Sequence, residues 1–295
     1  MNNISLLLPS KSLKRPLDAL SWHTFQLRYR ITQDTWLPPH KSAAWRGTLG
    51  HILKDKAPYI YDRLFECKIP VTHPYAGRFR TMPNPYIVHI PETQKTTYRR
   101  GEILHVNLTL IGECADFFPD LLGVLNKMDG RGLGPKRARI SLIDFKSLSH
   151  ETLRENLPAH FPNTFNSCYL HFNSPMRLGK QREKDGPDLQ KILLRLAERV
   201  ALQAHFHCGS ELSLMHEEIL EALPKIIPFE HKLHWVHRPR FSTRYGKSMP
   251  IGGWMGKIGC TRVPQELLPL LQIGQHIHIG KGSTWGLGRY TLEYL

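Results

Sequence analysis

The chain has 295 residues, with 40 Lys and Arg against 25 Asp and Glu, which gives a formal net charge of +15 before its 17 histidines are counted. Its 41% hydrophobic and 9% aromatic content is typical of globular proteins and excludes wholesale disorder. The sequence has no apolar run of about 18 residues, so we expect no membrane-spanning helix, and the apolar stretch at residues 4–8 is too short for a secretory signal. The charge favours a polyanionic partner, either nucleic acid or an anionic membrane surface.

Five cysteines are spread along the chain without a C-x-x-C pair, and we expect them to be reduced thiols of a cytoplasmic protein. One zinc site is conceivable, with His205, His207 and Cys208 as ligands, but the sequence offers no second ligand pair at finger-like spacing. The simpler interpretation is that these three are ordinary buried or surface side chains. The sequence therefore predicts neither a metal site nor a cofactor.

The first half of the chain predicts alternating strands and helices. Apolar residues at every second position favour a strand over residues 23–32, and helical spacing favours a helix from Ser42 that ends before Pro58. Residues 66–100 are rich in Pro, Tyr and Arg and predict an irregular connection or a hairpin. A strand over 102–110 and a helix over 116–128 follow, and then a glycine-rich basic loop, Gly130–Arg139, leads into another strand.

The second half repeats this pattern after a predicted linker at residues 146–166. A strand over 168–172 precedes a long amphipathic helix over 187–206. The remaining predicted elements are strands at 233–236 and 254–260, a short helix at 264–271, and a glycine-rich segment that leads into the last strand, 277–295.

An internal repeat sets the expected fold. The triplets Gly132-Leu133-Gly134 and Gly286-Leu287-Gly288 each follow a helix and precede a strand, about half the chain apart. Each half then has the order of a β-α-β-β-α-β unit. We predict an α+β protein of two tandem ferredoxin-like, RRM-like domains, residues 1–148 and 149–295, the second of which carries a C-terminal glycine-rich loop.

Neither glycine loop has the spacing of a Walker loop or of a dinucleotide fingerprint. Glycines nevertheless let the backbone approach a ligand and let successive amides form an anion-binding concavity. A glycine-rich turn before a strand can also be a purely structural tight turn. Two such loops with basic neighbours, in a chain of this charge, favour binding to a phosphodiester backbone.

The ending Gly280–Arg289 resembles the C-terminal glycine-rich loop of the repeat-associated (RAMP) proteins of CRISPR systems, and more narrowly that of their precursor-RNA processing endoribonucleases. Other segments resemble that family in the same order: Ala44–His51, Gly130–Arg139, Ser174–Leu178, and Phe241–Gly246 with Gly252–Gly256. One departure is that relatives often carry several cysteines in the region where this chain has only Cys67 before Pro70. The resemblance spans nearly the whole chain.

The resemblance implies two ferredoxin-like domains, a basic face that binds CRISPR repeat RNA, and cleavage without a metal. The expected reaction is attack of a ribose 2′-hydroxyl on the adjacent phosphate. It implies His51 on the first helix as the catalytic histidine, with Lys54 one turn further on as a cation for the phosphorane. His278, Tyr59 and Tyr61 are further candidates for the acid or base.

The RNA-binding residues that we expect are the basic residues and glycines in and beside the resembling segments: Arg46, Arg131, Lys136, Arg137, Arg139, Arg177, Lys180, Arg182, Arg244, Lys247, Gly280, Lys281, Gly282, Ser283 and Arg289. The expected partners are repeat RNA, its processed guide RNA and subunits of a CRISPR effector complex. The alternative function is that of a non-catalytic subunit of the same superfamily, which holds guide RNA in such a complex.

Overall fold

The computed structural model describes residues 16–91, 93, 95–152, 167–179, 186–242 and 247–295. The first half of the chain forms strands β1 (Ser21–Ile31), β2 (Thr35–Trp36), β3 (Tyr86–His89), β4 (Thr97–Tyr98), β5 (Ile103–Ile111) and β6 (Ile140–Thr152). Its helices are α2 (Lys41–Lys56), α3 (Pro58–Tyr61), α4 (Phe118–Leu125) and α5 (Met128–Arg131), with a π-helix η1 (Asp62–Glu66) and a 3-10 helix η2 (Gly112–Phe117).

The second half forms strands β7 (Ser167–Met176), β8 (Ile227–Val236), β9 (Pro239–Ser242), β10 (Lys247–Pro250), β11 (Gly253–Thr261) and β12 (Tyr290–Tyr294). Its helices are α7 (Leu189–Cys208), α8 (His216–Ala222) and α9 (Leu268–Ile277), with 3-10 helices η3 (Leu223–Lys225), η4 (Gln265–Leu267) and η5 (Ser283–Trp285). No helix in this described part of the chain is both long and apolar enough to cross a bilayer.

Both main sheets are antiparallel and have the same strand order. The first sheet runs β3-β5-β1-β6 and the second β12-β7-β11-β8. When the four strands of each sheet are numbered in chain order, the first and third lie in the centre and the second and fourth at the edges. This is the arrangement of a ferredoxin-like β-α-β-β-α-β unit. The predicted tandem ferredoxin-like fold is therefore confirmed.

Four sequence predictions are wrong in detail. Residues 146–152, predicted as part of a linker, continue strand β6, while the rest of that segment lies outside the described residues. Segment 66–100, predicted as an irregular connection or a hairpin, contains the short strands β3 and β4, which pair with β5 and β2 and not with each other. The helix predicted over 116–128 is divided into η2, α4 and α5, and α8 was not predicted. The division of the chain at residue 148 stays a prediction.

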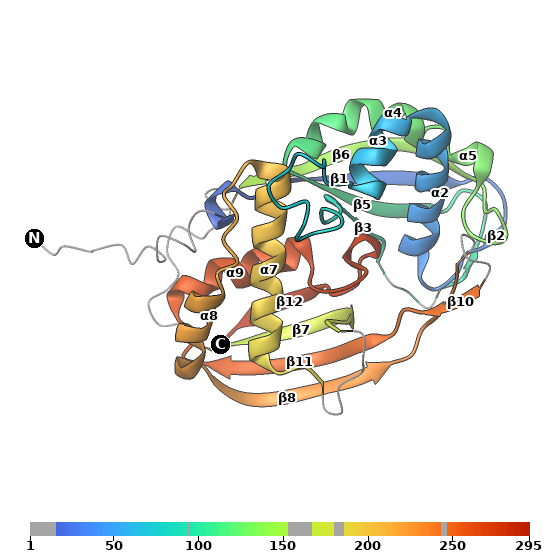
Figure 1. Ribbon diagram of the computed structural model, residues 1–295. Coiled ribbons are helices and arrows are strands. Elements are labelled where there is room, and N and C mark those ends of the chain that lie inside the picture. The colour runs from blue at the N-terminus through green and yellow to red at the C-terminus, as the bar shows by residue number, and fades with distance from the viewer. Residues whose placement is uncertain (1–15, 92, 94, 153–166, 180–185, 243–246) are drawn as a thin grey trace, which may run out of the picture.

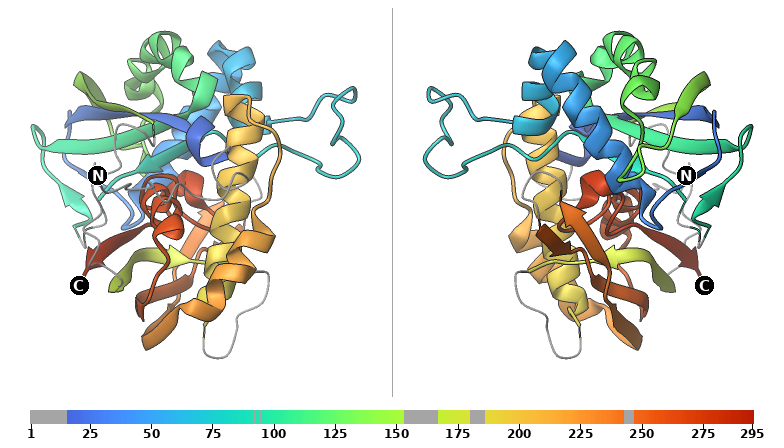
Figure 2. Two further views of the ribbon diagram at one scale, coloured as in Figure 1. Left: turned by 90° about the vertical axis from the view of Figure 1, so that its left-hand side faces the viewer. Right: turned by 90° about the vertical axis from the view of Figure 1, so that its right-hand side faces the viewer.

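The two units share a buried interface. Helices α7 and α9 lie between the second sheet and the first unit (Figure 1), where Trp22, Ile87 and Ile111 pack into the core of the second unit. The side chain of Gln203 on α7 donates to the Asn84 carbonyl at 2.9 Å. Figure 2 shows the cyan segment between η1 and β3 projecting beside α7, which it contacts through His73. These contacts hold the elements of the site at fixed positions relative to the second unit.

Candidate active site

Helix α2 positions the predicted catalytic pair on its solvent side. Trp45, Leu49 and Leu53 recur at helical spacing and are almost completely buried against the first sheet. The helix ends before Pro58, because proline disfavours the helical conformation of the residue that precedes it, and Ala57 has left the helical conformation. His51 and Lys54, on the opposite face, are exposed. The predicted adjacency of these two side chains on one helix face is present in the structure.

The charges around His51 favour its neutral form. Partial burial lowers the pKa of His51 below its usual 6.5, and the neighbouring cations Arg131 and Lys54 lower it further, while Asp55 acts in the opposite direction. A neutral imidazole can accept a proton at neutral pH. Asp55, one turn along the helix from His51, was not singled out from the sequence, although its spacing of four residues would have been sufficient to find it.

The first glycine loop brings Arg131 close to His51. The hydroxyl of Thr48 on α2 donates to the Gly132 carbonyl at 2.9 Å, which joins the loop to the helix. Leu133 and Ala138 then exchange two backbone hydrogen bonds and close a tight turn. Lys136 and Arg137 lie exposed at this turn, and Arg139 donates to the Asp129 carbonyl at 2.7 Å. The loop thus presents cations beside His51.

Arg46, predicted as a phosphate contact, has two partners within the protein. Its Nε donates to the Tyr86 hydroxyl at 2.9 Å, and its guanidinium lies 4.5 Å from the centre of the Phe65 ring. The phenol of Tyr86 is buried, and this burial raises its pKa to about 12. Arg46 therefore joins α2, η1 and β3 below the exposed face that carries His51.

The C-terminal glycine loop uses most of its amides internally. Six backbone N–H groups between Gly280 and Arg289 donate to acceptors of the second unit, those of Lys281, Trp285, Gly286, Leu287, Gly288 and Arg289. The acceptors include the carbonyls of Arg177 and Pro175 and the hydroxyl of Ser174. The concavity open to an anion is therefore narrower than the sequence suggested.

This second loop lies against the first unit. Its short helix η5 contacts α2 and β3, and a side chain added at Gly286 would approach the Val88 carbonyl. Lys281 is exposed and Arg289 is half-buried, but the side chain of Ser283, which we expected to bind RNA, is buried. The structure therefore places Lys281 and helix α2 on neighbouring parts of the molecule, although they are far apart in the sequence.

His278, a further candidate for the acid or base, is buried and lies outside any strand. Helix α9 ends at Ile277, and His278 follows it with a φ of 57° and a side chain that is 3% exposed. Burial, and then the neighbouring His89, Arg199 and Arg289, place its pKa well below 6.5. Its ring centre lies 6.3 Å from that of His89. His278 is thus a neutral histidine at the interface of the two units.

Tyr59 and Tyr61 each have a carboxylate partner. The Tyr59 hydroxyl donates to Asp120 at 2.7 Å and that of Tyr61 to Glu66 at 3.0 Å. The three residues of the conceivable zinc site do not converge, since they contact Ser210, Pro83 and Ser21 respectively. Four expected RNA contacts have side chains outside the described part of the structure, namely Lys180, Arg182, Arg244 and Lys247.

Acid is expected to weaken the interface between the units. Burial lowers the pKa of His207 to about 4, against 6.5 for an unperturbed histidine, so the unfolded chain takes up the proton first as the pH falls. His207 alone should cost about 2 kcal/mol of unfolding free energy between pH 7 and pH 5. Urea unfolding at the two pH values measures this loss, and His207→Gln, which does not titrate, should reduce it by that amount. An unchanged pH dependence in His207→Gln would contradict the assignment.

The fold and the site together define a tandem ferredoxin-like protein with an exposed histidine on α2 and two basic glycine loops. Residues 170–290 match the family model of the CRISPR-associated endoribonuclease Cas6, and residues 20–160 match a family model described as an N-terminal domain. The second unit of the chain is thus similar in sequence to the Cas6 family. Among curated proteins, none matches it in sequence.

Solved structures of Cas6 proteins share this fold. The partial Cas6-RT-Cas1–Cas2 complex matches with a TM-score of 0.63 at 15% identity, over 94% of this chain and 46% of that one. A Cas6 product complex matches with a TM-score of 0.61 at 15% identity, over 92% of this chain and 100% of that one. A Cas6 of Thermus thermophilus matches with a TM-score of 0.57 at 14% identity, over 93% of this chain and 99% of that one. This chain therefore spans less than half of the first of these proteins and nearly all of the other two.

Proposed function

We propose that the protein is an endoribonuclease that cuts CRISPR repeat RNA without a metal ion and releases guide RNA. In the proposed reaction the 2′-oxygen attacks the adjacent phosphorus, and the bond from phosphorus to the 5′-oxygen of the next nucleotide breaks. One fragment then ends in a 2′,3′-cyclic phosphate and the other begins with a 5′-hydroxyl. The match of residues 170–290 to the Cas6 family model and the likeness of the fold to a Cas6 product complex support the substrate class.

The groups around His51 supply two of the three functions that this reaction needs. A neutral His51 takes the proton of the 2′-hydroxyl as the general base. Lys54 and Arg131, the cations that depress its pKa, stabilise the additional negative charge of the phosphorane. The general acid that protonates the leaving 5′-oxygen is not assigned. The observation that carries the proposal is this exposed histidine, held between two cations on the helix that the first glycine loop contacts.

The proposal is tested by incubating purified protein with its cognate repeat RNA in EDTA. We expect cleavage in EDTA, and we expect it to disappear when the nucleotide 5′ of the scissile phosphate carries a 2′-deoxy sugar. The cyclic end is recognised because it resists phosphatase until acid opens it. RNA that is bound tightly but stays intact would instead support a non-catalytic subunit that holds guide RNA.

Lys281→Ala should weaken RNA binding to the same extent for all RNA sequences. Lys281 is exposed on the C-terminal glycine loop, where a phosphate contact adds affinity but no base readout. We expect the slope of log affinity against log salt to fall by about one unit. Lys225→Ala, at an exposed lysine of η3, is the matched control for loss of one charge. Equal salt slopes for the two variants would remove Lys281 from the RNA-binding surface.

A further inference from the structure

Strand β6 presents a long free edge. It is the last strand of the first sheet, hydrogen bonded to β1 on one side and to no other strand among the described residues on the other side. It comprises 13 residues, which is long for an edge strand. Exposed edges of this kind tend to pair with other strands unless something protects them.

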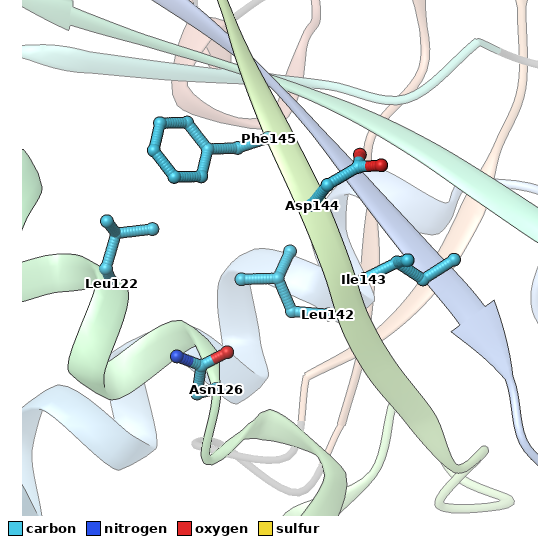
Figure 3. A pocket seen from close by; sticks show the side chains of 6 residues that line it. All are labelled: Leu122, Asn126, Leu142, Ile143, Asp144 and Phe145. Carbon is cyan, nitrogen blue, oxygen red and sulfur yellow. The ribbon is translucent and has the colours of Figure 1, made fainter.

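Apolar side chains are exposed along this edge. Ile143 is 37% exposed, and Phe145 and Leu148 are each 44% exposed. Beside Phe145 lies a shallow hollow, to which Leu122 of α4 and Asn126, the residue after α4, contribute (Figure 3). Phe145 and Leu142 lie on the α4 side of the strand, whereas Asp144 and Ile143 lie on the other side. A partner strand at this edge would cover apolar surface on the α4 side.

Two β-bulges restrict where a partner can pair. Arg28 is opposite Asp144 while its neighbour Tyr29 is opposite Leu142, so Ile143 is an extra residue, and Leu148 is extra in the same way. Between the two bulges, residues 144–147 keep a regular register with β1. A bulge interrupts the pairing of one strand with the next. The two bulges therefore favour a short pairing with a partner strand, centred near Phe145.

The regular segment is complementary to itself in charge. In an antiparallel pairing with a two-fold axis at Phe145, Asp144 of each copy lies opposite Lys146 of the other, and the two Phe145 rings meet on the α4 side. Opposite charges directly across two strands are favourable, and a two-fold interface makes each such contact twice. We propose that two copies of this chain associate through the β6 edges, with the partner's Phe145 beside the hollow at Leu122.

Charge reversal tests this arrangement without depending on RNA cleavage. Asp144→Lys places Lys opposite Lys in a homodimer, and Lys146→Asp places Asp opposite Asp, so each variant alone should associate at least about tenfold more weakly. Mixed together, the two variants form only opposite-charge pairs, and a heterodimer with roughly wild-type affinity should appear. Sedimentation velocity of each variant and of the mixture, over a concentration series, measures these affinities.

The heterodimer also separates the proposal from simple loss of folding. Asp144 accepts a hydrogen bond from Arg28 at 2.8 Å, so Asp144→Lys disturbs its own chain, but that disturbance remains in the mixture and would not be reversed there. The Phe145→Lys variant should not self-associate, because it loses the apolar contact at the centre of the interface. A wild-type chain that stays monomeric, or a mixture that does not associate, would overturn the proposal and leave the edge to a different protein partner.

Discussion

His51→Ala is expected to lose cleavage by about 10²- to 10⁴-fold while the affinity for repeat RNA stays nearly unchanged, because a general base contributes to the transition state rather than to binding. His51 is exposed and its neighbours depress its pKa, so the wild-type side chain is in the proton-accepting form near neutral pH. Single-turnover cleavage and equilibrium binding of a 2′-deoxy RNA separate the two effects. His105→Ala, at an exposed histidine of β5, is the matched control.

The pH profile gives this prediction a second test. With neutral His51 as the base, the cleavage rate should rise with pH and level off above a pKa that is lower than 6.5. Asp55 raises that pKa, so Asp55→Asn should move the rise to lower pH, and Lys54→Ala should move it to higher pH while also reducing the plateau rate. If His51→Ala cleaves at the wild-type rate, the base is a different residue, and neither shift should then be seen.

The sequence predicted the fold well because the two halves repeat one pattern. Helix α2 and strand β1 lie close to their predicted bounds, since their apolar residues recur at clear helical and strand periods. The prediction failed where local signals are weak or where tertiary contacts decide. Two bulges disturb the alternation of β6, and the four-residue strand β3 is stabilised by its pairing with β5 rather than by its own pattern.

The site shows the same division. His51 and Lys54 are neighbours because they lie on one helix, and the sequence suffices to place them together. Arg131 reaches His51 only because Thr48 holds the first glycine loop against α2, and that contact spans 84 positions of the chain. The burial of His278 results from the packing of the second unit against β3, which no local pattern records. Charges near the candidate active site can thus be found from sequence within one element but not between elements.

Gly288→Ala is expected to destabilise the protein by about 2 kcal/mol or more and to weaken RNA binding through the C-terminal loop. Gly288 has a φ of 69°, a left-handed conformation that costs any other residue type about 1–2 kcal/mol. A Cβ there would also overlap the Ile279 carbonyl oxygen, which is backbone and cannot rotate away. The loop must therefore shift, and with it the hydrogen bonds that join Gly288 to Pro175 and Ile279.

Gly123→Ala is the matched control for this substitution. Gly123 lies within α4 and no atom stands within 4 Å of the position that its Cβ would take, so alanine should raise stability by up to about 1 kcal/mol. Urea unfolding of both variants and their RNA affinities at two salt concentrations measure the contrast. A Gly288→Ala protein as stable as the wild type would show that the loop tolerates a second conformation. If the Gly288→Ala variant also bound RNA with wild-type affinity, the conformation of the C-terminal glycine loop beside Lys281 would not contribute to RNA binding.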